Sequence, residues 1–324
     1  MTSLSAFRFL ALLTLLGAST TFAAVTQTSK AGLAWPNGDT VSMGQFAGTG
    51  KVSWYYTWIS GPINYDAGLE FVPMLWGDEA SIKTWDKDIK NVLKNKKDTT
   101  AVMGMNEPDH EGQAHLTPEQ GAKVWQDHLE PLRAEGIRLG SPGTTSAGYG
   151  KQWHLDWNTA CAGGCNYDFL VVHHYGTNAT DFIRYVTDMY ETFKKPVWVT
   201  EWADHDFSGH NRIATAAEIA DYLKATQEWM DSTTWIERYA WFGAMKNTRN
   251  VNPDNGMIDQ NGAINALGLQ YINWTAPGVP DSSLPKGANK PGRNSSSPSH
   301  PISALFLALS VVMLFGLQHV HLLT

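Results

Sequence analysis

Two glutamates end apolar, strand-like segments of this chain and could perform acid–base and nucleophilic chemistry together. Glu107 stands in Asn-Glu-Pro after the apolar run 100–105, and Glu201 stands in Thr-Glu-Trp after the run 197–200. A carboxylate at the end of an apolar strand is costly to bury without a use. Retaining glycoside hydrolysis needs two of them, one to protonate the leaving oxygen and one to attack the anomeric carbon. Either motif alone also fits a solvated strand end, but the pair favours catalysis.

Eight apolar, β-prone segments are spread along the chain and would have to position these glutamates. They are 31–35, 52–58, 69–76, 100–106, 138–143, 168–175, 196–201 and 238–245. Nearly continuous apolar strands that alternate with helices are typical of a parallel sheet covered on both faces.

Helical patterns lie between several of these segments. Residues 79–97 have apolar side chains three or four apart, and 181–193 is amphipathic. Capping boxes at 117–120 and 215–218 predict helices that run to about residues 135 and 230. The connectors after the first two strands are short and glycine-rich, so we expect compact or missing helices there.

The pattern predicts a single α/β domain, a (β/α)8 TIM barrel, over residues 24–276. Glu107 ends the fourth strand and Glu201 the seventh, and barrel sites lie at the C-terminal ends of strands. An open doubly wound sheet with a nucleotide at its edge is the alternative. No G-x-G-x-x-G or P-loop pattern follows any of the strands to support it.

Strand alternation predicts which other side chains face the barrel axis with the two glutamates. The apolar ones would be Met103, Met105, Val197 and Val199. Asn106 could reach a sugar hydroxyl from the rim, although turn chemistry before Pro108 explains it equally well. His173 and Tyr175 share a face and are expected in the cleft, with His174 pointing away.

Fourteen tryptophans, all between residues 24 and 276, suit a cleft for sugars because indole offers a flat apolar face and one N–H. Any one of them could equally be core packing. The tryptophans at or near strand ends that we predict to contact substrate are Trp35, Trp58, Trp76, Trp202 and Trp241.

Both ends of the chain read as targeting segments. Residues 1–23 resemble a secretory signal peptide, with Arg8 before a short apolar stretch and Thr-Phe-Ala at 21–23. Residues 277–300 are rich in Pro, Ser, Gly and Asn, typical of a linker, and 301–324 is an apolar tail. Together they predict lipid (GPI) attachment near Asn294 and a location at the cell surface or wall. A single C-terminal membrane span is the rival interpretation.

Secretion has consequences for the cysteines and asparagines. Cys161 and Cys165 are predicted to form a disulfide, and the sequons at Asn178, Asn273 and Asn294 are candidate glycosylation sites. The cysteine spacing is not Cys-x-x-Cys, and no second cysteine pair completes a zinc site, so a metal or redox role of the cysteines is disfavoured. We expect no metal and no cofactor in this protein. The net charge of −7 and the lack of a basic run exclude nucleic acid as a favoured partner.

Several short motifs together resemble glycoside hydrolase family 128, the fungal-type β-1,3-glucanases of clan A with an alkali-sensitive-linkage-like core. They are Asn-Glu-Pro at 106–108, Thr-Glu-Trp at 200–202, and the segments 32–35, 54–58, 73–76, 173–176 and 240–243. The resemblance covers about residues 30–274. It implies a compact barrel, a retaining mechanism, β-1,3-glucan as partner, no metal, Glu107 as acid/base and Glu201 as nucleophile. His174 stands where related chains often have an aromatic residue, which puts the shape of that subsite in doubt.

Other functions remain open from sequence. A surface protein that binds β-glucan without cutting it would not need both glutamates, and a clan A hydrolase for β-1,4-linked glucan or mannan would differ only in cleft shape. A structural wall mannoprotein would need longer Ser/Thr-rich stalks than 277–300. Transglycosylation to a sugar acceptor is compatible with the same residues, and we expect a monomer.

Overall fold

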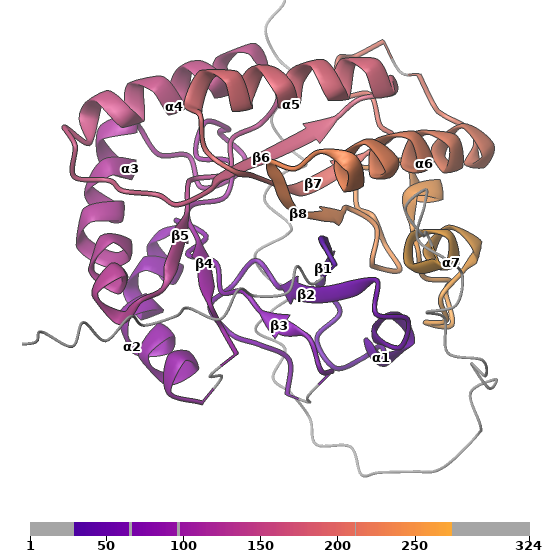
Figure 1. Ribbon diagram of the computed structural model, residues 1–324, viewed down its shortest axis with the longest axis horizontal. Helices are drawn as coiled ribbons and strands as arrows, with labels where there is room; N and C mark the ends of the chain where they lie inside the picture. The colour runs from indigo at the N-terminus through magenta and orange to yellow at the C-terminus, as the bar shows by residue number, and fades with distance from the viewer. Residues whose placement is uncertain (1–28, 65–66, 96–97, 211, 274–324) are drawn as a thin grey trace, which may run out of the picture.

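The computed structural model describes residues 29–64, 67–95, 98–210 and 212–273, in which eight strands lie parallel (Figure 1). The strands are β1 (Ala31–Ala34), β2 (Val52–Tyr56), β3 (Glu70–Phe71), β4 (Ala101–Met103), β5 (Arg138–Gly140), β6 (Leu170–Tyr175), β7 (Val197–Ala203) and β8 (Ile236–Trp241). Each one falls within or overlaps a segment that the sequence predicts, so the eight predicted strands are confirmed.

The strands form a ring. Six pair continuously in the order β3-β2-β1-β8-β7-β6, and β4 pairs with β5. Isolated parallel bridges join the two parts. Met74, just after β3, pairs with Met103 of β4, and Gly140 of β5 pairs with Phe169, just before β6. Each strand therefore has a neighbour on both sides, which is the closed (β/α)8 barrel that the sequence predicts.

The helices on the predicted segments are α2 (Glu79–Asn95), α3 (Pro118–Val124), α5 (Ala179–Phe193) and α6 (Ala216–Ser232). Both predicted capping boxes are formed, by Thr117 with Gln120 and by Thr215 with Glu218. The helix expected to reach residue 135 breaks into a π turn, η1 (Trp125–Leu129), and a 3-10 turn, η2 (Glu130–Glu135). Pro131 lacks the N–H that an unbroken helix would need.

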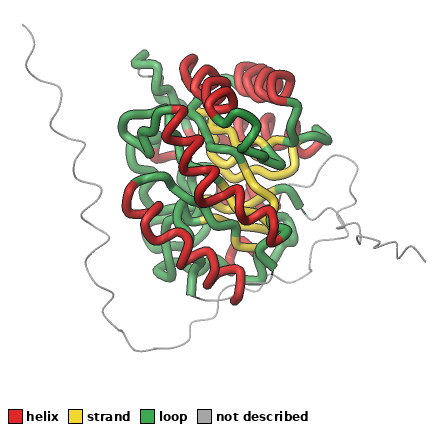
Figure 2. The backbone as a smooth tube through the Cα atoms, turned by 90° about the vertical axis from the view of Figure 1, so that its left-hand side faces the viewer, coloured by secondary structure: helices red, strands yellow, loops and turns green. Residues whose placement is uncertain are grey.

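The remaining helices are one short turn and two that sequence patterns did not indicate. Only α1 (Gly44–Ala47) follows β1, and no helix lies between β2 and β3 in the described residues, as expected for the first connectors. The structure adds α4 (Gly148–Ala160), α7 (Ala266–Asn273) and a 3-10 turn, η3 (Pro253–Asn255). Figure 2 shows the helices around the strands.

Two apolar clusters fill the protein, one inside the barrel and one between strands and helices. The inner cluster contains Ala34, Trp54, Tyr56, Val72, Met74, Ala101, Met103, Phe169, Val171, Trp198 and Ala240. Met103 was correctly predicted to face inward. Met105, Val197 and Val199 belong to the outer cluster, so their predicted inward orientation was wrong.

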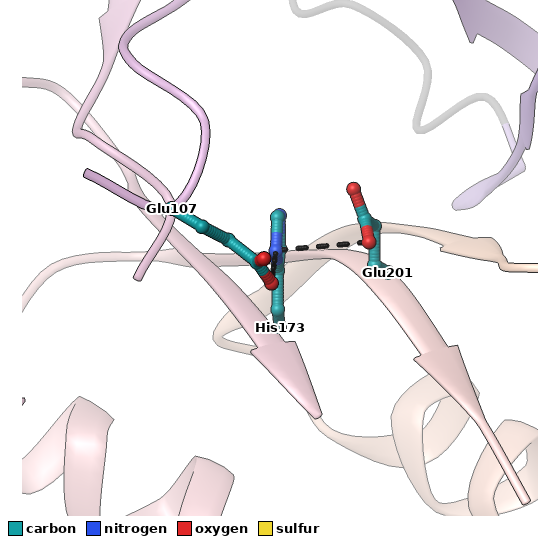
Figure 3. Close-up of side chains that lie close together, drawn as sticks. All are labelled: Glu107, His173 and Glu201. Carbon is teal, nitrogen blue, oxygen red and sulfur yellow. Dashed lines mark hydrogen bonds and ion pairs between the residues drawn. The ribbon is translucent and has the colours of Figure 1, made fainter. Parts of the chain in front are cut away.

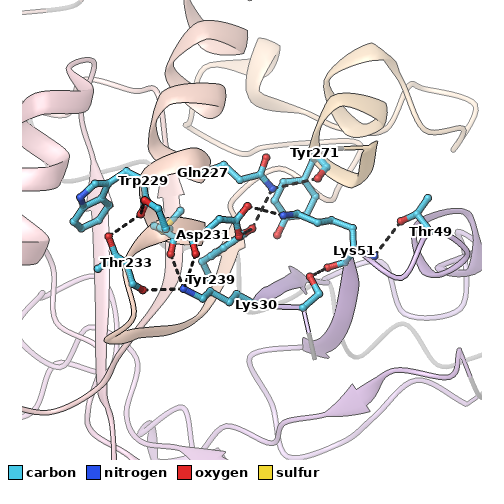
Figure 4. A network of polar contacts seen from close by, with 12 residues as sticks. Lys30, Thr49, Lys51, Gln227, Trp229, Asp231, Thr233, Tyr239 and Tyr271 are labelled. Carbon is cyan, nitrogen blue, oxygen red and sulfur yellow. Dashed lines mark hydrogen bonds and ion pairs between the residues drawn. The ribbon is translucent and has the colours of Figure 1, made fainter. Parts of the chain in front are cut away.

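A polar network ties β1 and β8 to the end of α6 at the N-terminal face of the barrel (Figure 4). The Lys30 ammonium donates to three backbone carbonyls, those of Met230, Asp231 and Thr233, at 2.8, 3.1 and 2.8 Å. A cation at a helix C-terminus offsets the dipole and satisfies carbonyls that lack helical partners. The Tyr239 hydroxyl donates to the Asp231 carboxylate at 2.7 Å. These bonds fix the start of β1 and the middle of β8 against the end of α6.

Cys161 and Cys165 form the predicted disulfide, with Cα atoms 5.5 Å apart. Asn178 is exposed and caps α5, and Asn273 ends α7. The predicted signal peptide, linker, Asn294 and apolar tail lie outside the described residues. Within the described ranges, no helix has the length and apolar character required to cross a membrane.

Candidate active site

The C-terminal ends of β4, β6 and β7 bring three ionisable side chains together (Figure 3). The His173 Nδ1 lies 2.9 Å from the Glu107 Oε1 and 3.8 Å from the Glu201 Oε2. One oxygen from each carboxylate and one ring nitrogen all lie within 4.8 Å of one another. All three residues are buried, His173 completely. The sequence predicted each of them for this face of the barrel.

Glu107 is held by its backbone and by the next loop. Its φ of +42° is in the left-handed region, which is uncommon outside glycine and is found at functional sites. Its N–H donates to the Gly143 carbonyl at 2.7 Å. A Cβ at Gly143 would lie 3.0 Å from the His173 Nε2, so glycine permits this close approach. Strand alternation alone does not carry Glu107 inward, because Met105 faces outward.

Glu201 points toward Glu107 and His173 because of an irregularity in β7. The pairing of β7 with β8 shifts register between Val199 and Trp202. The pairing of β7 with β6 shifts register between Val172 and His173 of β6. A bulge of this kind re-aims the following side chain. Trp198 therefore faces the barrel interior while Glu201 faces the site.

Two neutral donors bind the Glu201 carboxylate. The Trp58 Nε1 donates to Oε1 at 2.7 Å, and the Tyr175 hydroxyl donates to Oε2 at 2.7 Å. Trp58 has a φ of +60°, a second strained residue at the site. An indole N–H can only donate, so these contacts favour the ionised form of Glu201.

Burial and charge act in opposite directions in this cluster. Burial lowers the pKa of His173, but the negative charges of Glu201 and Glu107 outweigh burial and raise this pKa to about 9. Burial raises the pKa of Glu201, whereas His173 and the donors Tyr175 and Trp58 oppose this rise. Burial also raises the pKa of Tyr175, so its phenol stays a neutral donor. At neutral pH His173 is therefore an imidazolium between two carboxyl groups.

The same three side chains form a cluster whose donor atoms are close enough to hold a metal ion. A protonated imidazole cannot ligate a metal, and the Nδ1 of His173 is directed at Glu107. The arrangement thus favours an ion pair over a metal centre, and the absence of a metal stays a prediction.

Aromatic rings continue outward from Glu201. Trp58 contacts Phe242, Phe242 contacts Tyr175, and Tyr175 contacts Phe207, with ring centroids 5.9, 5.6 and 5.2 Å apart. Phe242 and Phe207 were not predicted. Alternation indicates Phe242 only once Trp241 is known to face the helices, because neighbouring side chains point to opposite sides, whereas Phe207 lies in a loop without such a signal.

Three of the predicted substrate-binding tryptophans are core residues. Trp35, Trp202 and Trp241 are completely buried in the outer cluster. Trp202 donates its indole N–H to Thr226 of α6, and Trp241 donates to the Asn255 carbonyl. Their prediction as a sugar platform was wrong, because the apolar outer face of a barrel strand needs bulky residues beneath the helices. Trp58 lies in the site.

Trp76 and Asn106 lie beside the site. Trp76 is partly buried and packs against both apolar clusters. Asn106 is only 3% exposed, and its amide donates to Gln113 at 3.2 Å. It does not reach the rim as predicted, and whether either residue contacts a sugar stays a prediction. His174 packs outward against Phe182 and Tyr185 of α5, as expected.

Comparison with known families gave one match over most of the chain. A family model described as the glycosyl hydrolase catalytic core matches residues 32–271. No match was found among curated proteins.

Solved structures with similar folds share a quarter to a third of their residues with this chain. A curdlan-specific exo-β-1,3-glucanase of family 128, subgroup III, from Blastomyces gilchristii in complex with glucose is 30% identical, covers 76% of this chain and 99% of its own, and has a TM-score of 0.62. A subgroup VI exo-β-1,3-glucanase from Aureobasidium namibiae has 26% identity, coverages of 76% and 96%, and a TM-score of 0.64. A subgroup I endo-β-1,3-glucanase from Amycolatopsis mediterranei in complex with laminaritriose has 28% identity, covers 76% of this chain and 98% of its own, and has a TM-score of 0.61.

Proposed function

The chain belongs to glycoside hydrolase family 128, and we propose that it hydrolyses β-1,3-glucan with Glu107 as acid/base and Glu201 as nucleophile. One observation carries the proposal. Two buried glutamates at the ends of β4 and β7 have carboxylate oxygens within 4.8 Å of each other, beside aromatic rings that suit a sugar. The similar structures include family 128 enzymes solved with glucose and with laminaritriose.

The spacing of the carboxylates supports a retaining mechanism. Retaining enzymes hold the two groups about 5–5.5 Å apart, whereas inverting enzymes keep about 6.5–9.5 Å to admit a water between them. One oxygen of each carboxylate lies within 4.8 Å of the other, which is closer to the retaining spacing than to the inverting one.

The contacts of the two glutamates support the assignment of roles. Glu201 accepts hydrogen bonds from the Trp58 indole and the Tyr175 hydroxyl and lies 3.8 Å from the His173 ring, and each of these contacts favours its carboxylate form. Within the described residues, the Glu107 carboxyl has one side-chain hydrogen-bond partner, His173. Glu201 is therefore the better stabilised of the two as an anion, which suits a nucleophile.

The reaction follows in two steps. Glu107 gives its proton to the glycosidic oxygen as the bond to the anomeric carbon breaks, and the Glu201 carboxylate forms an ester with that carbon. Glu107, now ionised, removes a proton from water, and the oxygen of that water displaces Glu201. The released sugar keeps the β configuration. A sugar hydroxyl in place of water would give transglycosylation instead.

The experiment is a screen of the purified chain against soluble β-1,3-, β-1,4- and β-1,6-glucans, with sizing of the products. We expect shorter oligosaccharides from β-1,3-glucan alone, and almost none with Glu107→Gln or Glu201→Gln. Glu191→Gln, a change on the exposed face of α5, is the control and should cut normally. Binding of β-1,3-glucan without any release of products would instead favour a non-catalytic glucan-binding protein, and cleavage of β-1,4-glucan would overturn the substrate.

We also propose that the protein is secreted and held at the cell surface by a lipid at its C-terminus, as residues 1–23 and 277–324 suggest. A phosphatidylinositol-specific phospholipase should release it from intact cells. Continued need for detergent would favour a membrane span.

A further inference from the structure

The loop after β7 carries a half-exposed phenylalanine beside the catalytic residues. Phe207 is 51% exposed, yet its ring is fixed by two edge contacts. The ring centroids lie 5.2 Å from Tyr175 and 4.2 Å from His205. Tyr175 in turn donates to Glu201, so Phe207 lies one aromatic ring beyond the nucleophile. Packing accounts for one side of Phe207 and leaves the other side open.

His205 offers a hydrogen-bond donor at the same place. The Asn252 N–H donates to the His205 Nδ1 at 3.0 Å, which puts the ring proton of the neutral form on Nε2. Burial lowers the pKa of His205, so the ring is neutral at neutral pH. His205 therefore presents an N–H beside the ring of Phe207.

The start of the loop is rigid. The Asn255 side chain accepts from the Asp204 N–H at 3.0 Å and donates to the Asp204 carbonyl at 2.9 Å. Asp204 is buried and directly precedes His205. A site held in place before the ligand arrives loses less entropy on binding.

We infer that Phe207 and His205 form a subsite for the glucosyl unit next to the one that Glu201 attacks. The inference rests on the proposed function. A pyranose has a C–H face that packs on an aromatic ring and hydroxyl oxygens that accept from an N–H, and this pair supplies both partners side by side. Since neither residue touches the reacting atoms, they select and hold the chain and take no part in bond cleavage.

Calorimetry with laminaritriose and laminaripentaose tests this in the Glu201→Gln background, where substrate is bound but not cut. Phe207→Ala should weaken the Kd about tenfold, or 1.4 kcal/mol, and Phe207→Trp should restore it. His205→Ala should weaken the Kd about fivefold. The control Leu269→Ala, a residue of α7 with a similar exposed fraction of 45%, should bind like its parent. Thermal unfolding confirms that each variant is folded.

The two proposals fail differently. If the Glu201→Gln parent binds no laminari-oligosaccharide, the proposed function fails and this subsite with it. If the parent binds but Phe207→Ala binds equally well, or Leu269→Ala loses as much affinity, the subsite is refuted and the function stands. If Phe207→Ala does not fold, Phe207→Leu provides the comparison, since it keeps the apolar bulk and removes the flat ring.

Discussion

His173 should set the pH range of catalysis, and replacing it by glutamine tests the electrostatics of the site. His173→Gln keeps an N–H that can reach Glu107 and removes the positive charge. The His173 Nδ1 lies 3.8 Å from the Glu201 Oε2, and the two side chains are 1% and 6% exposed. At an effective dielectric constant of about 20 the attraction is roughly 4 kcal/mol. Protein and water relax around the new side chain, so we expect part of this energy to appear in the pH profile.

The direction follows from the sign of the charge. The His173 cation opposes the rise in the pKa of Glu201 that burial causes, so its removal lets this pKa rise further. Activity needs Glu201 ionised, and the acidic limb of kcat/KM should therefore move to higher pH, by about one unit or more.

Initial rates on a soluble β-1,3-glucan from pH 3 to 9 measure this limb. His174→Gln is the control, since His174 faces α5 and its pKa is lowered by burial to about 4. The control should keep the wild-type limbs. An acidic limb of His173→Gln that stays in place or moves to lower pH would refute the reasoning.

Three further changes separate roles in the site from roles in the fold. Trp58→Phe keeps the ring but loses the N–H on Glu201, and we expect kcat to fall about 10- to 100-fold with little change in KM, measured by steady-state kinetics; an unchanged kcat would remove this contact from catalysis. Trp241→Ala should lower the free energy of unfolding by about 3–5 kcal/mol in urea titrations, while the folded protein binds laminari-oligosaccharides normally; weaker binding would restore Trp241 as a platform. The double change Cys161→Ser and Cys165→Ser removes the disulfide and should lower the free energy of unfolding by about 2 kcal/mol, with activity intact at 25 °C. A loss of activity in the folded protein would contradict a purely structural role of the disulfide.

Sequence reasoning located the strands and the glutamates but not the inner and outer faces. Strands buried on both sides are apolar throughout, so Val197, Trp198 and Val199 look alike in sequence although only Trp198 faces the barrel interior. Glu201 faces the site because β7 shifts register before it, and a bulge has no reliable sequence signal.

The tryptophans show the same limit. A strand-end indole fits a sugar platform and the packing beneath a helix equally well, and only the three-dimensional arrangement distinguishes Trp58 from Trp202 and Trp241. Trp58 has a left-handed backbone conformation, and its indole N–H donates to Glu201. Such a conformation depends on the surrounding fold and cannot be predicted from residue type.

Chemical rescue of Glu201→Ala by azide tests the central claim most directly. In this variant the acid Glu107 remains and the nucleophile is gone, so azide can attack the anomeric carbon in place of Glu201. We predict a variant that is inactive on β-1,3-glucan and, with azide, yields the α-glycosyl azide, whose configuration NMR identifies. A β-glycosyl azide, or full activity without azide, would contradict the role of Glu201 as the nucleophile of a retaining enzyme.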